Sequence, residues 1–200
     1  MEILLATRNQ KKLSELEALL ADMPVEVLSL RDFPDAPEVE ETGHTFAENA
    51  EIKARSAALA TGRIALADDS GLEVDALDGQ PGVRSNRFAG PDAADRDKCM
   101  LVLDLMKDVP DGKRSARFRA AVAVASPDGR VSIVEGMCGG VIAREPKGEG
   151  GFGYDPIFYL PDMGRTMAEL SPDEKNLISH RAKALSAARS VLLEILGRHD

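Results

Sequence analysis

The segment Phe152–Phe158, which directly follows the glycines at 148, 150 and 151, places the aromatic residues Phe152 and Tyr154 on either side of Gly153 and next to the carboxylate of Asp155. A packed core does not require this combination, whereas aromatic faces in a flexible loop can stack on a flat ligand. The alternative is a loop that only connects two elements of the fold. The segment therefore predicts a binding site for a planar ligand.

The residues Gly148–Gly153 also match the spacing G-x-G-x-x-G, which is typical of dinucleotide-binding folds when it follows a strand and opens a helix. Here Tyr154, Asp155 and Pro156 come directly afterwards, and the residue before a proline is biased away from helical geometry. We therefore reject the dinucleotide-binding interpretation and keep that of a ligand-stacking loop.

A second polar group follows the first apolar run, where we expect a strand to end and a helix to begin. Its members are Thr7, Arg8, Asn9, Gln10, Lys11 and Lys12. Backbone N–H groups and the helix dipole at such a junction point towards an anion, and the two lysines add positive charge, so we expect phosphate binding. Asn9 is suited to cap the helix. The alternative is a capped surface helix with two solvated lysines.

An acidic pair, Asp68 and Asp69, follows another apolar run and precedes Ser70–Gly71. We expect these residues to form a turn at the mouth of a sheet, where ligand sites of α/β proteins usually lie. Carboxylate oxygens suit Mg²⁺, and Glu40 and Glu41 in a long acidic loop offer a further ligand. The alternative is a turn whose aspartates accept hydrogen bonds from backbone donors.

Hydrogen-bond donors gather near the end of the chain, at Lys175 and at Ser179–His180–Arg181. Such donors suit a keto oxygen on a ligand. A lone His180 is more often an ordinary surface histidine, and no nearby serine or cysteine suggests the nucleophile of a catalytic triad. We therefore interpret this group as a binding site and not as a nucleophilic centre.

Alternating strands and helices position these groups. The periodicity and turn signals predict strands over about 2–6, 25–30, 63–67, 72–76 and 117–125, the last of which forms a hairpin with 130–136 that continues towards 142. The pattern is typical of a single α/β domain, residues 1–200, with a mixed sheet.

The expected helices have recognisable ends. Leucines at helical spacing mark a helix from about 13 to 23, and Thr45 to Glu48 fits a capping box for a helix over 46–61 that ends at Gly62. A third helix is expected from Asp92 to about 106. Ser171–Glu174 is a second capping box, and we favour a break at Ser179 over one continuous helix to 197.

Composition narrows the class of protein. With 200 residues the chain is near the size of one domain, and its net charge of −9 argues against a nonspecific nucleic-acid surface. An anionic ligand then needs a site that is locally basic or holds a metal. The two cysteines, Cys99 and Cys138, have no metal-site spacing, and we expect reduced, buried thiols. The N-terminus lacks the features of a signal peptide and no long apolar run is present, so we expect a cytoplasmic protein without a membrane segment.

The four polar groups together resemble the inosine triphosphate pyrophosphatase (HAM1-like) family, whose members hydrolyse non-standard purine nucleoside triphosphates. The resemblance runs from residue 6 to residue 181. It is carried by Ala6–Asn9 with Lys12, Glu40–Gly43, Phe46–Lys53, Ala67–Leu72, Gly150–Phe158 and Ile178–Arg181.

This resemblance implies an elongated mixed α/β sheet flanked by helices, with two lobes around a nucleotide cleft, and a homodimer. It implies Mg²⁺-dependent hydrolysis of ITP, dITP and XTP to a nucleoside monophosphate and pyrophosphate, which cleanses the nucleotide pool and prevents incorporation into DNA and RNA. Asp69 is the implied general base, and the implied metal ligands are Glu41 or Glu40 with Asp68 or Asp69.

The resemblance also implies which residues contact the substrate. Phe152 and Tyr154 would sandwich the base, and Asp155 with the C-terminal donors would bind its edge. The full implied set is Thr7, Arg8, Asn9, Gln10, Lys11, Lys12, Lys53, Ser70, Phe152, Gly153, Tyr154, Asp155, Lys175, Ser179, His180 and Arg181. A 6-keto purine accepts from such donors, whereas the amino group of adenine would leave them unpaired.

Three other functions remain as alternatives. A pyrophosphatase for modified pyrimidine nucleotides would share the phosphate chemistry, but the expected keto-binding donors disfavour it. A nucleotide-binding module without catalysis would not need Asp68, Asp69 and Glu41 near phosphates, where unneutralised carboxylates weaken binding. An acidic structural protein does not explain the clustered aromatic residues and donors.

Overall fold

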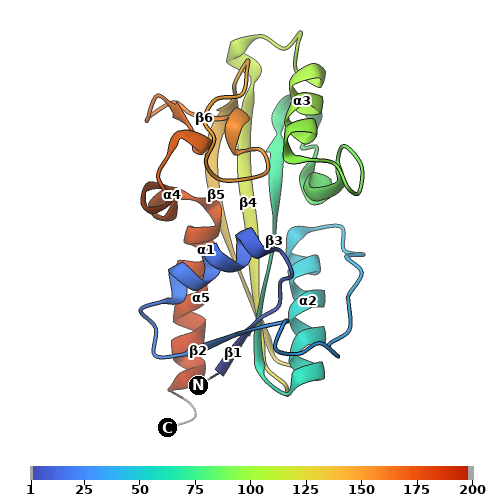
Figure 1. The fold of residues 1–200 in the computed structure, drawn as a ribbon, viewed down its shortest axis with the longest axis vertical. Coiled ribbons are helices and arrows are strands. Elements are labelled where there is room, and N and C mark those ends of the chain that lie inside the picture. The colour runs from blue at the N-terminus through green and yellow to red at the C-terminus, as the bar shows by residue number, and fades with distance from the viewer. Residues whose placement is uncertain (1, 198–200) are drawn as a thin grey trace. The chain divides into compact units, whose positions relative to one another are not determined.

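The computed structural model describes residues 2–197 and contains one mixed β-sheet with helices packed against it (Figure 1). Within these residues the sheet has seven strands in the order β2-β1-β3-β4-β5-β6-β7. The strands are β1 (Glu2–Leu5), β2 (Glu26–Ser29), β3 (Ile64–Val74), β4 (Ser115–Ala125), β5 (Val131–Ile142), β6 (Phe158–Leu160) and β7 (Arg165–Thr166).

The sheet is mixed because its two edges are built differently. β1 pairs in parallel with both β2 and β3, which requires crossover connections through helices. β5 pairs antiparallel with β6, and β6 antiparallel with β7. The predicted α/β class with a mixed sheet flanked by helices is therefore confirmed.

Five α-helices and several short 3₁₀ helices complete residues 2–197. The α-helices are α1 (Gln10–Leu20), α2 (Phe46–Thr61), α3 (Asp95–Leu105), α4 (Pro172–Ile178) and α5 (His180–Leu196). The 3₁₀ turns are η1 (Asp75–Leu77), η2 (Gly82–Arg87), η3 (Asp111–Lys113), η4 (Asp155–Ile157) and η5 (Met167–Glu169). In this part of the chain, no helix combines the length and apolar character needed to cross a membrane.

The chain divides into two compact units. Unit 1 comprises residues 1–69, 120–136 and 181–200, and unit 2 comprises residues 70–119 and 137–180. The chain crosses from one unit to the other at predicted site residues in two places, between Asp69 and Ser70 and between His180 and Arg181. The predicted site residues are thus shared between the units, and we describe each unit separately.

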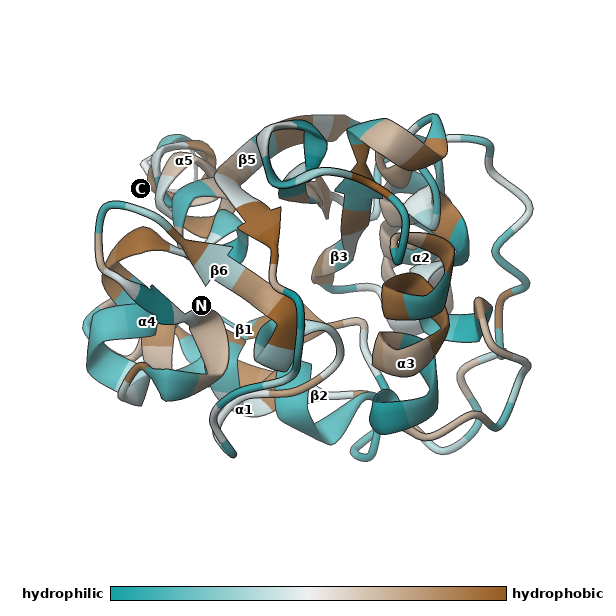
Figure 2. Cartoon of the chain, turned by 90° about the horizontal axis from the view of Figure 1, so that it is seen from above, coloured by the Kyte–Doolittle hydropathy of each residue, from teal (hydrophilic) through white to brown (hydrophobic). Residues whose placement is uncertain are grey.

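The core of unit 1 follows from alternation along its strands. Ile3 and Leu5 of β1 and Ile64 and Leu66 of β3 are buried in one cluster with leucines of α1 and α5. Successive strand residues point to opposite faces, so this cluster defines the face covered by α1 and α5. Figures 1 and 2 both place α2 on the other side of these strands. Unit 1 therefore has two distinct sheet faces, one covered by α1 and α5 and the other by α2.

The core of unit 2 surrounds the end of β3. Leu72 packs in a cluster with Cys99 of α3, with Met106 directly after that helix and with Phe158 of β6, and all four side chains are nearly inaccessible. In Figure 2 the helices carry both hydrophilic and hydrophobic residues, as expected for helices with one apolar face. This cluster supports the loop that precedes β6, which contains the predicted stacking residues.

The helix boundaries that depend on capping are confirmed. Thr45 caps α2 by accepting from the Glu48 N–H, and Gly62 ends that helix in the left-handed conformation at φ +67°. Ser171 and Glu174 form the predicted capping box of α4. Ser179 has extended dihedral angles between α4 and α5, so the chain does break there. These ends were predictable because a cap needs only residues close together in sequence.

Two predicted boundaries are wrong. The acidic pair does not form a turn, because β3 runs without interruption from Ile64 to Val74. α3 begins at Asp95 and not at Asp92, with Ala94 in the N-cap position. In both cases the carboxylates are used by distant partners, as described below, so local turn and capping preferences do not decide the backbone.

Candidate functional site

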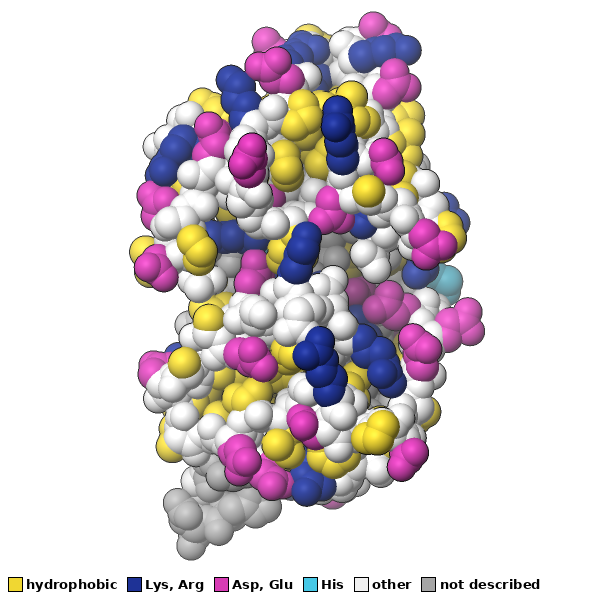
Figure 3. All heavy atoms as spheres, in the orientation of Figure 1, with side chains coloured by type: hydrophobic (Ala, Val, Ile, Leu, Met, Phe, Trp, Pro, Cys, Tyr) yellow, Lys and Arg dark blue, Asp and Glu magenta, His cyan; other side chains and the backbone are white. Residues whose placement is uncertain are grey.

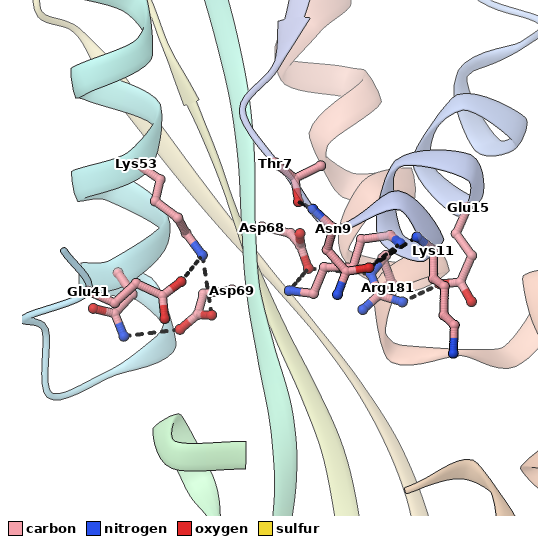
Figure 4. Close-up of polar contacts among 11 residues, drawn as sticks. Thr7, Asn9, Lys11, Glu15, Glu41, Lys53, Asp68, Asp69 and Arg181 are labelled. Atoms are coloured by element: carbon pink, nitrogen blue, oxygen red, sulfur yellow. Dashed lines mark hydrogen bonds and ion pairs between the residues drawn. The ribbon is translucent and has the colours of Figure 1, made fainter. Parts of the chain in front are cut away.

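Asp68 and Asp69 are consecutive residues of β3, and this determines the geometry of the site in unit 1. Their side chains point to opposite faces of the strand. Asp68 shares the alternation of Ile64 and Leu66 and faces α1 and α5, whereas Asp69 faces α2. Figure 4 shows the two carboxylates pointing apart, each into its own group of polar side chains. The two carboxylates therefore belong to two separate groups of polar side chains.

On the α2 side, Lys53 joins two carboxylates. Its Nζ lies 2.7 Å from Glu41 Oε1 and 3.3 Å from Asp69 Oδ1 (Figure 4). Asn49 donates from Nδ2 to Asp69 Oδ2 at 3.1 Å. Asp69 is thus held by two groups one helical turn apart on α2, while Lys53 also reaches the acidic loop through Glu41. The structure brings the predicted Glu41, Lys53 and Asp69 together.

The acidic loop is fixed to the same helix by Asn49, which is fully buried. Its Oδ1 accepts from the Gly43 N–H at 2.8 Å, so one amide contacts both the loop and Asp69. A Cβ at Gly43 would lie 2.7 Å from Asn49 Oδ1, closer than real contacts allow. The absence of a side chain at Gly43 therefore lets the loop approach α2 and places Glu41 beside Lys53.

The electrostatics around Asp69 suit a proton acceptor. Burial raises the pKa of Asp69, and the negative charge of Glu41 acts in the same direction, while Lys53 and Lys12 oppose this increase. Burial alone would lower the pKa of Lys53, but the surrounding carboxylates raise it, so the ammonium stays charged. A carboxylate with a raised pKa is a better general base than an ordinary aspartate.

On the opposite face, Asp68 is paired with two cations. Its Oδ2 lies 2.9 Å from Lys12 Nζ and 3.3 Å from Arg181 Nε, and its side chain is fully buried. Burial by itself would raise the pKa of Asp68, but the positive charges of Lys12, Arg181 and Lys53 lower it far below its usual range. Asp68 is therefore a permanent anion and unsuited to accept a proton at neutral pH.

Arg181 was predicted to bind the base edge together with His180. In the structure its guanidinium is 2% exposed and contacts Asp68 and Glu15, both of unit 1. Its pKa is raised, because the two carboxylates more than offset the opposing effect of burial. Arg181 thus belongs to the charged cluster around Asp68.

The predicted phosphate-binding segment forms the start of α1. Asn9 is the N-cap, as predicted, and its Oδ1 accepts from the backbone N–H groups of Lys11 at 3.0 Å and Lys12 at 3.2 Å. Thr7 Oγ1 accepts from the Asn9 N–H at 3.3 Å. Among the two lysines, Lys12 points to Asp68 and Lys11 is exposed.

The remaining two members of that segment make contacts within unit 1. Arg8 donates to the Ala36 carbonyl at 3.3 Å, and Gln10 accepts from Arg31. Both side chains are exposed. On the face shown in Figure 3, acidic and basic side chains are interspersed. The protein as a whole has a net charge of −9. Positive charge near the two aspartates comes from three local cations, Lys12, Lys53 and Arg181.

In unit 2, the predicted stacking loop is held by Asp155. Its Oδ2 accepts from the Phe152 N–H at 2.9 Å and from Lys175 Nζ at 2.7 Å. The same ammonium lies 4.8 Å from the centre of the Phe152 ring, a cation–π distance. A Cβ at Gly151 would lie 2.0 Å from this Asp155 oxygen, so only glycine fits there. Phe152 remains half-buried, with part of its surface accessible.

Tyr154 does not provide the second stacking face that we expected. Its side chain is buried in the core of unit 2, and its hydroxyl donates to the Ser85 carbonyl at 2.9 Å. Burial raises the pKa of Tyr154, so the hydroxyl keeps its proton. The expectation of a ring sandwich is therefore wrong for Tyr154, because a buried hydroxyl found a backbone partner that the sequence could not indicate.

The peptide of Gly153 is fixed by the first turn of α3. The Gly153 N–H donates to Asp95 Oδ2 at 2.8 Å, and Cys99 Sγ lies 3.3 Å from the Gly153 carbonyl oxygen. Asp95 also pairs with Lys98 at 3.0 Å. Gly153 has φ +62°, a conformation that side chains rarely adopt. Helix α3 thus fixes the loop next to Phe152, which explains why it begins at Asp95.

The C-terminal donors of unit 2 are buried. His180 stacks on Phe118 with ring centres 4.8 Å apart and an angle of 16° between the rings. Ser179 is also buried, and its backbone N–H donates to the Lys175 carbonyl at 2.9 Å. Ser70, in β3, is half-buried. His180 is therefore a packed residue and not the ordinary surface histidine of the alternative interpretation.

The donors available for a divalent cation are limited to two carboxylates. Among residues 2–197 no group of three or more acidic, histidine or cysteine side chains is placed to hold a metal ion. Glu41 and Asp69 meet at Lys53, whereas Asp68 points to the other face and Glu40 is exposed. This donor set fits Mg²⁺, which proteins commonly bind through one or two carboxylates with phosphate oxygens of a substrate completing the shell.

With this geometry established, the chain can be compared with known proteins. A family model described as the Ham1 family matches residues 3–191. The chain belongs to this family. The predicted resemblance, made from six short motifs, is therefore confirmed over nearly the whole sequence.

Ham1 relatives share most of their length with this chain. A dITP/XTP pyrophosphatase of Geobacillus kaustophilus is 55% identical over 196 residues, covering 98% of this chain and 96% of the relative. A dITP/XTP pyrophosphatase of Desulforamulus reducens is 54% identical over 192 residues, covering 96% of each. The solved structure of a HAM1 protein from Coxiella burnetii is 48% identical, with a TM-score of 0.89, covering 97% of this chain and 99% of that one. The fold of this Ham1 protein is thus found along nearly the whole chain.

Several residues that contact the predicted site residues were missed by the sequence reasoning. They are Glu15, Asn49, Ser85, Asp95 and Cys99. Asn49 had a weak signal, since asparagine is a poor residue for a helix interior unless its side chain has a specific partner. The other four residues gave no signal in the sequence, because their partners lie more than fifty residues away along the chain.

Proposed function

We propose that this chain hydrolyses non-standard purine nucleoside triphosphates, namely dITP, XTP and ITP, to the nucleoside monophosphate and pyrophosphate. The observation that carries the proposal is the group Glu41–Lys53–Asp69, in which a buried base with a raised pKa lies beside a charged lysine. The names of the Ham1 relatives support the same substrate class.

The triphosphate requires positive charge, and unit 1 supplies it. Lys12 and Lys53 bind phosphate oxygens, and the N-terminus of α1, with the hydroxyl of Thr7 and the amide of Asn9, favours an anion through its dipole. Lysine is suited to this role because its ammonium is a compact point charge. These cations also stabilise the charge that moves onto the leaving pyrophosphate.

Asp69 acts as the general base. It takes a proton from water, the water oxygen forms a bond to the α-phosphorus, and the bond from that phosphorus to the oxygen shared with the β-phosphate breaks. Pyrophosphate leaves with the bonding electrons. The raised pKa of Asp69 supports this role, since a more basic carboxylate accepts the proton more readily.

Mg²⁺ is the proposed cofactor, and Glu41 and Asp69 are the residues that would hold it. When bound, it neutralises phosphate charge and polarises the phosphoryl group. Lys53 keeps both carboxylates near each other when the metal is absent, because its ammonium is attracted to both. Asp68 is not part of this proposal, since its carboxylate is used by Lys12 and Arg181.

Residues of unit 2 select the base. Phe152 stacks on the purine with its accessible ring, and Asp155, Lys175, Ser179 and His180 surround its edge. Stacking of this kind contributes roughly 1–3 kcal/mol per base. The 6-keto oxygen of hypoxanthine or xanthine accepts a hydrogen bond from the donors among them, Lys175, Ser179 and His180, whereas the 6-amino group of adenine cannot.

We further propose a cytoplasmic homodimer that removes these nucleotides before they are incorporated into DNA or RNA. The two buried free thiols support a reducing compartment. The dimer rests on the family resemblance.

Pyrophosphate release tests the proposal. The assay separates pyrophosphate from orthophosphate and compares dITP, ITP and XTP with ATP, GTP, CTP and UTP, each with and without Mg²⁺. Metal-dependent pyrophosphate from the inosine and xanthosine substrates is the expected result. A pyrimidine preference would overturn the base site in unit 2, and nucleotide binding without turnover would favour a binding module.

A further inference from the structure

Two carboxylates hold the backbone on either side of Phe152. The Phe152 N–H donates to Asp155 Oδ2 at 2.9 Å. The Gly153 N–H, which belongs to the peptide bond after Phe152, donates to Asp95 Oδ2 at 2.8 Å. A residue has only two soft backbone dihedral angles, and those of Phe152 lie between these two anchored peptide planes. The two contacts therefore fix the direction in which the Phe152 side chain leaves the backbone.

The ring of Phe152 is restrained as well. Lys175 Nζ lies over it, 4.8 Å from the ring centre, and the same ammonium is paired with Asp155 at 2.7 Å. The side chain as a whole is half-buried. Because both the backbone and one face of the ring are held, the accessible surface of Phe152 is presented in one orientation.

The contact of Asp95 is not explained by the helix that contains it. Asp95 is the first residue of α3, and the N-cap position before it is occupied by Ala94, whose side chain cannot cap a helix. A carboxylate in the first turn favours the helix dipole, but the exposed Asp97 supplies this as well. The hydrogen bond of Asp95 to Gly153, 58 residues away in the sequence, therefore points to a role in the loop.

Asp95 faces two donors, and a carboxylate is the group that satisfies both. Its Oδ2 accepts from the Gly153 N–H, and its Oδ1 lies 3.0 Å from Lys98 Nζ. The side chain of Lys98 is only 8% exposed, and a buried ammonium is costly unless it is paired. An asparagine side chain has one acceptor oxygen, and its amide nitrogen is itself a donor. Such a side chain could accept from Lys98 or from Gly153, but not from both.

We propose that Asp95 is a positioning residue for the purine base, acting through the Gly153 peptide on the orientation of the Phe152 ring. Lys98 holds one oxygen of Asp95 and thereby keeps the other directed at the loop. All four residues belong to unit 2. The inference rests on the proposed function for the identity of the base.

Asp95→Asn is the first variant, because it changes the acceptors and almost no volume. The ammonium of Lys98 is a stronger donor than a backbone N–H, so it should take the remaining oxygen, and Gly153 should lose its partner. The KM for dITP should rise several-fold, up to the increase of about tenfold expected when the ring itself is removed. The kcat and the inhibition constant for pyrophosphate should change little, because the residues of unit 1 are untouched.

Removal of Lys98 should reverse this effect. In Asp95→Asn/Lys98→Met, the single acceptor oxygen is released for the Gly153 N–H, and methionine is an unbranched side chain that adapts to the buried space of the lysine. The KM for dITP should return close to the wild-type value. Two changes that merely weakened the fold would instead add, so a double variant with a higher KM than Asp95→Asn would overturn the proposal.

A second cycle, with Phe152→Ala, tests whether Asp95 acts through the ring. When the ring is absent, Asp95→Asn should raise the KM for dITP much less than it does in the wild type. An equal increase in both backgrounds would show that Asp95 affects the substrate by another route, and the proposal would be wrong.

Hydrogen exchange of the Gly153 amide, measured by NMR without substrate, tests the contact directly. Exchange should be slow in the wild type, faster in Asp95→Asn and slow again in Asp95→Asn/Lys98→Met. Asp97→Asn is the matched control, since Asp97 is an exposed carboxylate in the same helical turn. It should behave as the wild type in every measurement.

The outcomes separate this inference from the proposed function. A wild-type KM for dITP in Asp95→Asn, or unchanged exchange of the Gly153 amide, would overturn the inference alone. If dITP binds but releases no pyrophosphate, the proposed reaction is refuted, and the dissociation constant for dITP replaces KM in the same comparisons. If Asp95→Asn does not fold, Asp95→Glu displaces the carboxylate by one methylene and should likewise raise KM and speed the exchange of Gly153.

Discussion

The two units hold their functional groups by different means. In unit 1, lysine and arginine side chains are positioned by carboxylates on the two faces of β3, through Asp68 and Asp69. In unit 2, the Phe152–Asp155 loop is positioned by hydrogen bonds that it donates: the Tyr154 hydroxyl to the Ser85 carbonyl, and the backbone N–H groups of Gly153 and Phe152 to the carboxylates of Asp95 and Asp155. Flexible charged chains can follow a substrate and its metal, whereas a fixed peptide loop presents one ring in one orientation.

This difference matches the two kinds of ligand group. A triphosphate has several charge states and many conformations, and electrostatic attraction tolerates this variety because it depends weakly on direction. A base edge is rigid and is distinguished by the direction of each hydrogen bond. The comparison predicts that changes in unit 1 act on catalysis and phosphate affinity, and changes in unit 2 on base selection.

The largest effect is expected for Asp69→Asn. The change removes the base with almost no change in volume, and general-base catalysis contributes about 10²–10⁴-fold, so kcat should fall by about that factor. The KM for dITP should change little. Steady-state pyrophosphate release measures both, with the exposed Asp162→Asn as control. Full activity in the Asp69 variant would remove the basis for assigning catalysis to unit 1.

The next effect is expected for Gly151→Ala, which tests the rigidity of the loop in unit 2. The new Cβ would lie 2.0 Å from Asp155 Oδ2 at φ +68°, so Asp155 must release Phe152 or Lys175. We expect the KM for dITP to rise by about tenfold or more, since a tenfold change corresponds to only about 1.4 kcal/mol.

Gly79→Ala is the control for this experiment. Gly79 also has a positive φ, +80°, but a Cβ there meets nothing within 4 Å. It therefore reports the backbone strain without the clash. Equal effects on KM from the two variants would show that the fixed position of Asp155 is unimportant for substrate binding.

A smaller effect, about tenfold in KM, is expected for Phe152→Ala, because base stacking contributes roughly 1–3 kcal/mol. The loss should be similar for dITP and GTP, since every purine has a ring face. His180→Ala should instead reduce the preference for 6-keto purines over ATP. The ratio of kcat/KM values for dITP and ATP separates the two variants, and an unchanged ratio for His180→Ala would count against a base site in unit 2.

The smallest effect concerns Cys99, which contacts the Gly153 carbonyl. Burial, followed by the charges of Asp95 and Asp155, raises the pKa of Cys99 to about 12. The thiolate is the reactive form, so the reactive fraction at pH 8 is about one in 10⁴ and grows with rising pH. Iodoacetamide should modify Cys99 slowly in the folded protein and rapidly after unfolding, as measured by peptide mass mapping. Rapid modification at pH 8 would indicate that the loop opens readily.

The sequence predicted features whose causes are local. The caps at Thr45, Asn9 and Ser171 depend on donors and acceptors within three residues, and they were placed correctly. The break at Ser179 was also foreseen. The identification of Asp69, Lys53 and Glu41 as neighbours came from the family resemblance, and the structure brings them together.

The sequence misjudged residues whose behaviour depends on distant partners. Two consecutive aspartates are typical of a turn, yet Asp68 and Asp69 continue a strand. Lys12 and Arg181 neutralise the carboxylate of Asp68, and Lys53 and Asn49 pair with that of Asp69. The aromatic ring of Tyr154 is of a type that stacks on bases, yet it is packed in the core and its hydroxyl donates to the Ser85 carbonyl.

The sequence by itself determined the family, the fold class, the capped helix ends and the set of chemical groups, because these follow from residue type and short-range spacing. Only the tertiary structure decided that Asp68 and Asp69 serve opposite faces, that Arg181 is paired with Asp68, and that Phe152 is the accessible ring. The physical reason is that burial and charge pairing join residues such as Glu15 and Arg181, 166 positions apart, and no local preference encodes such a contact.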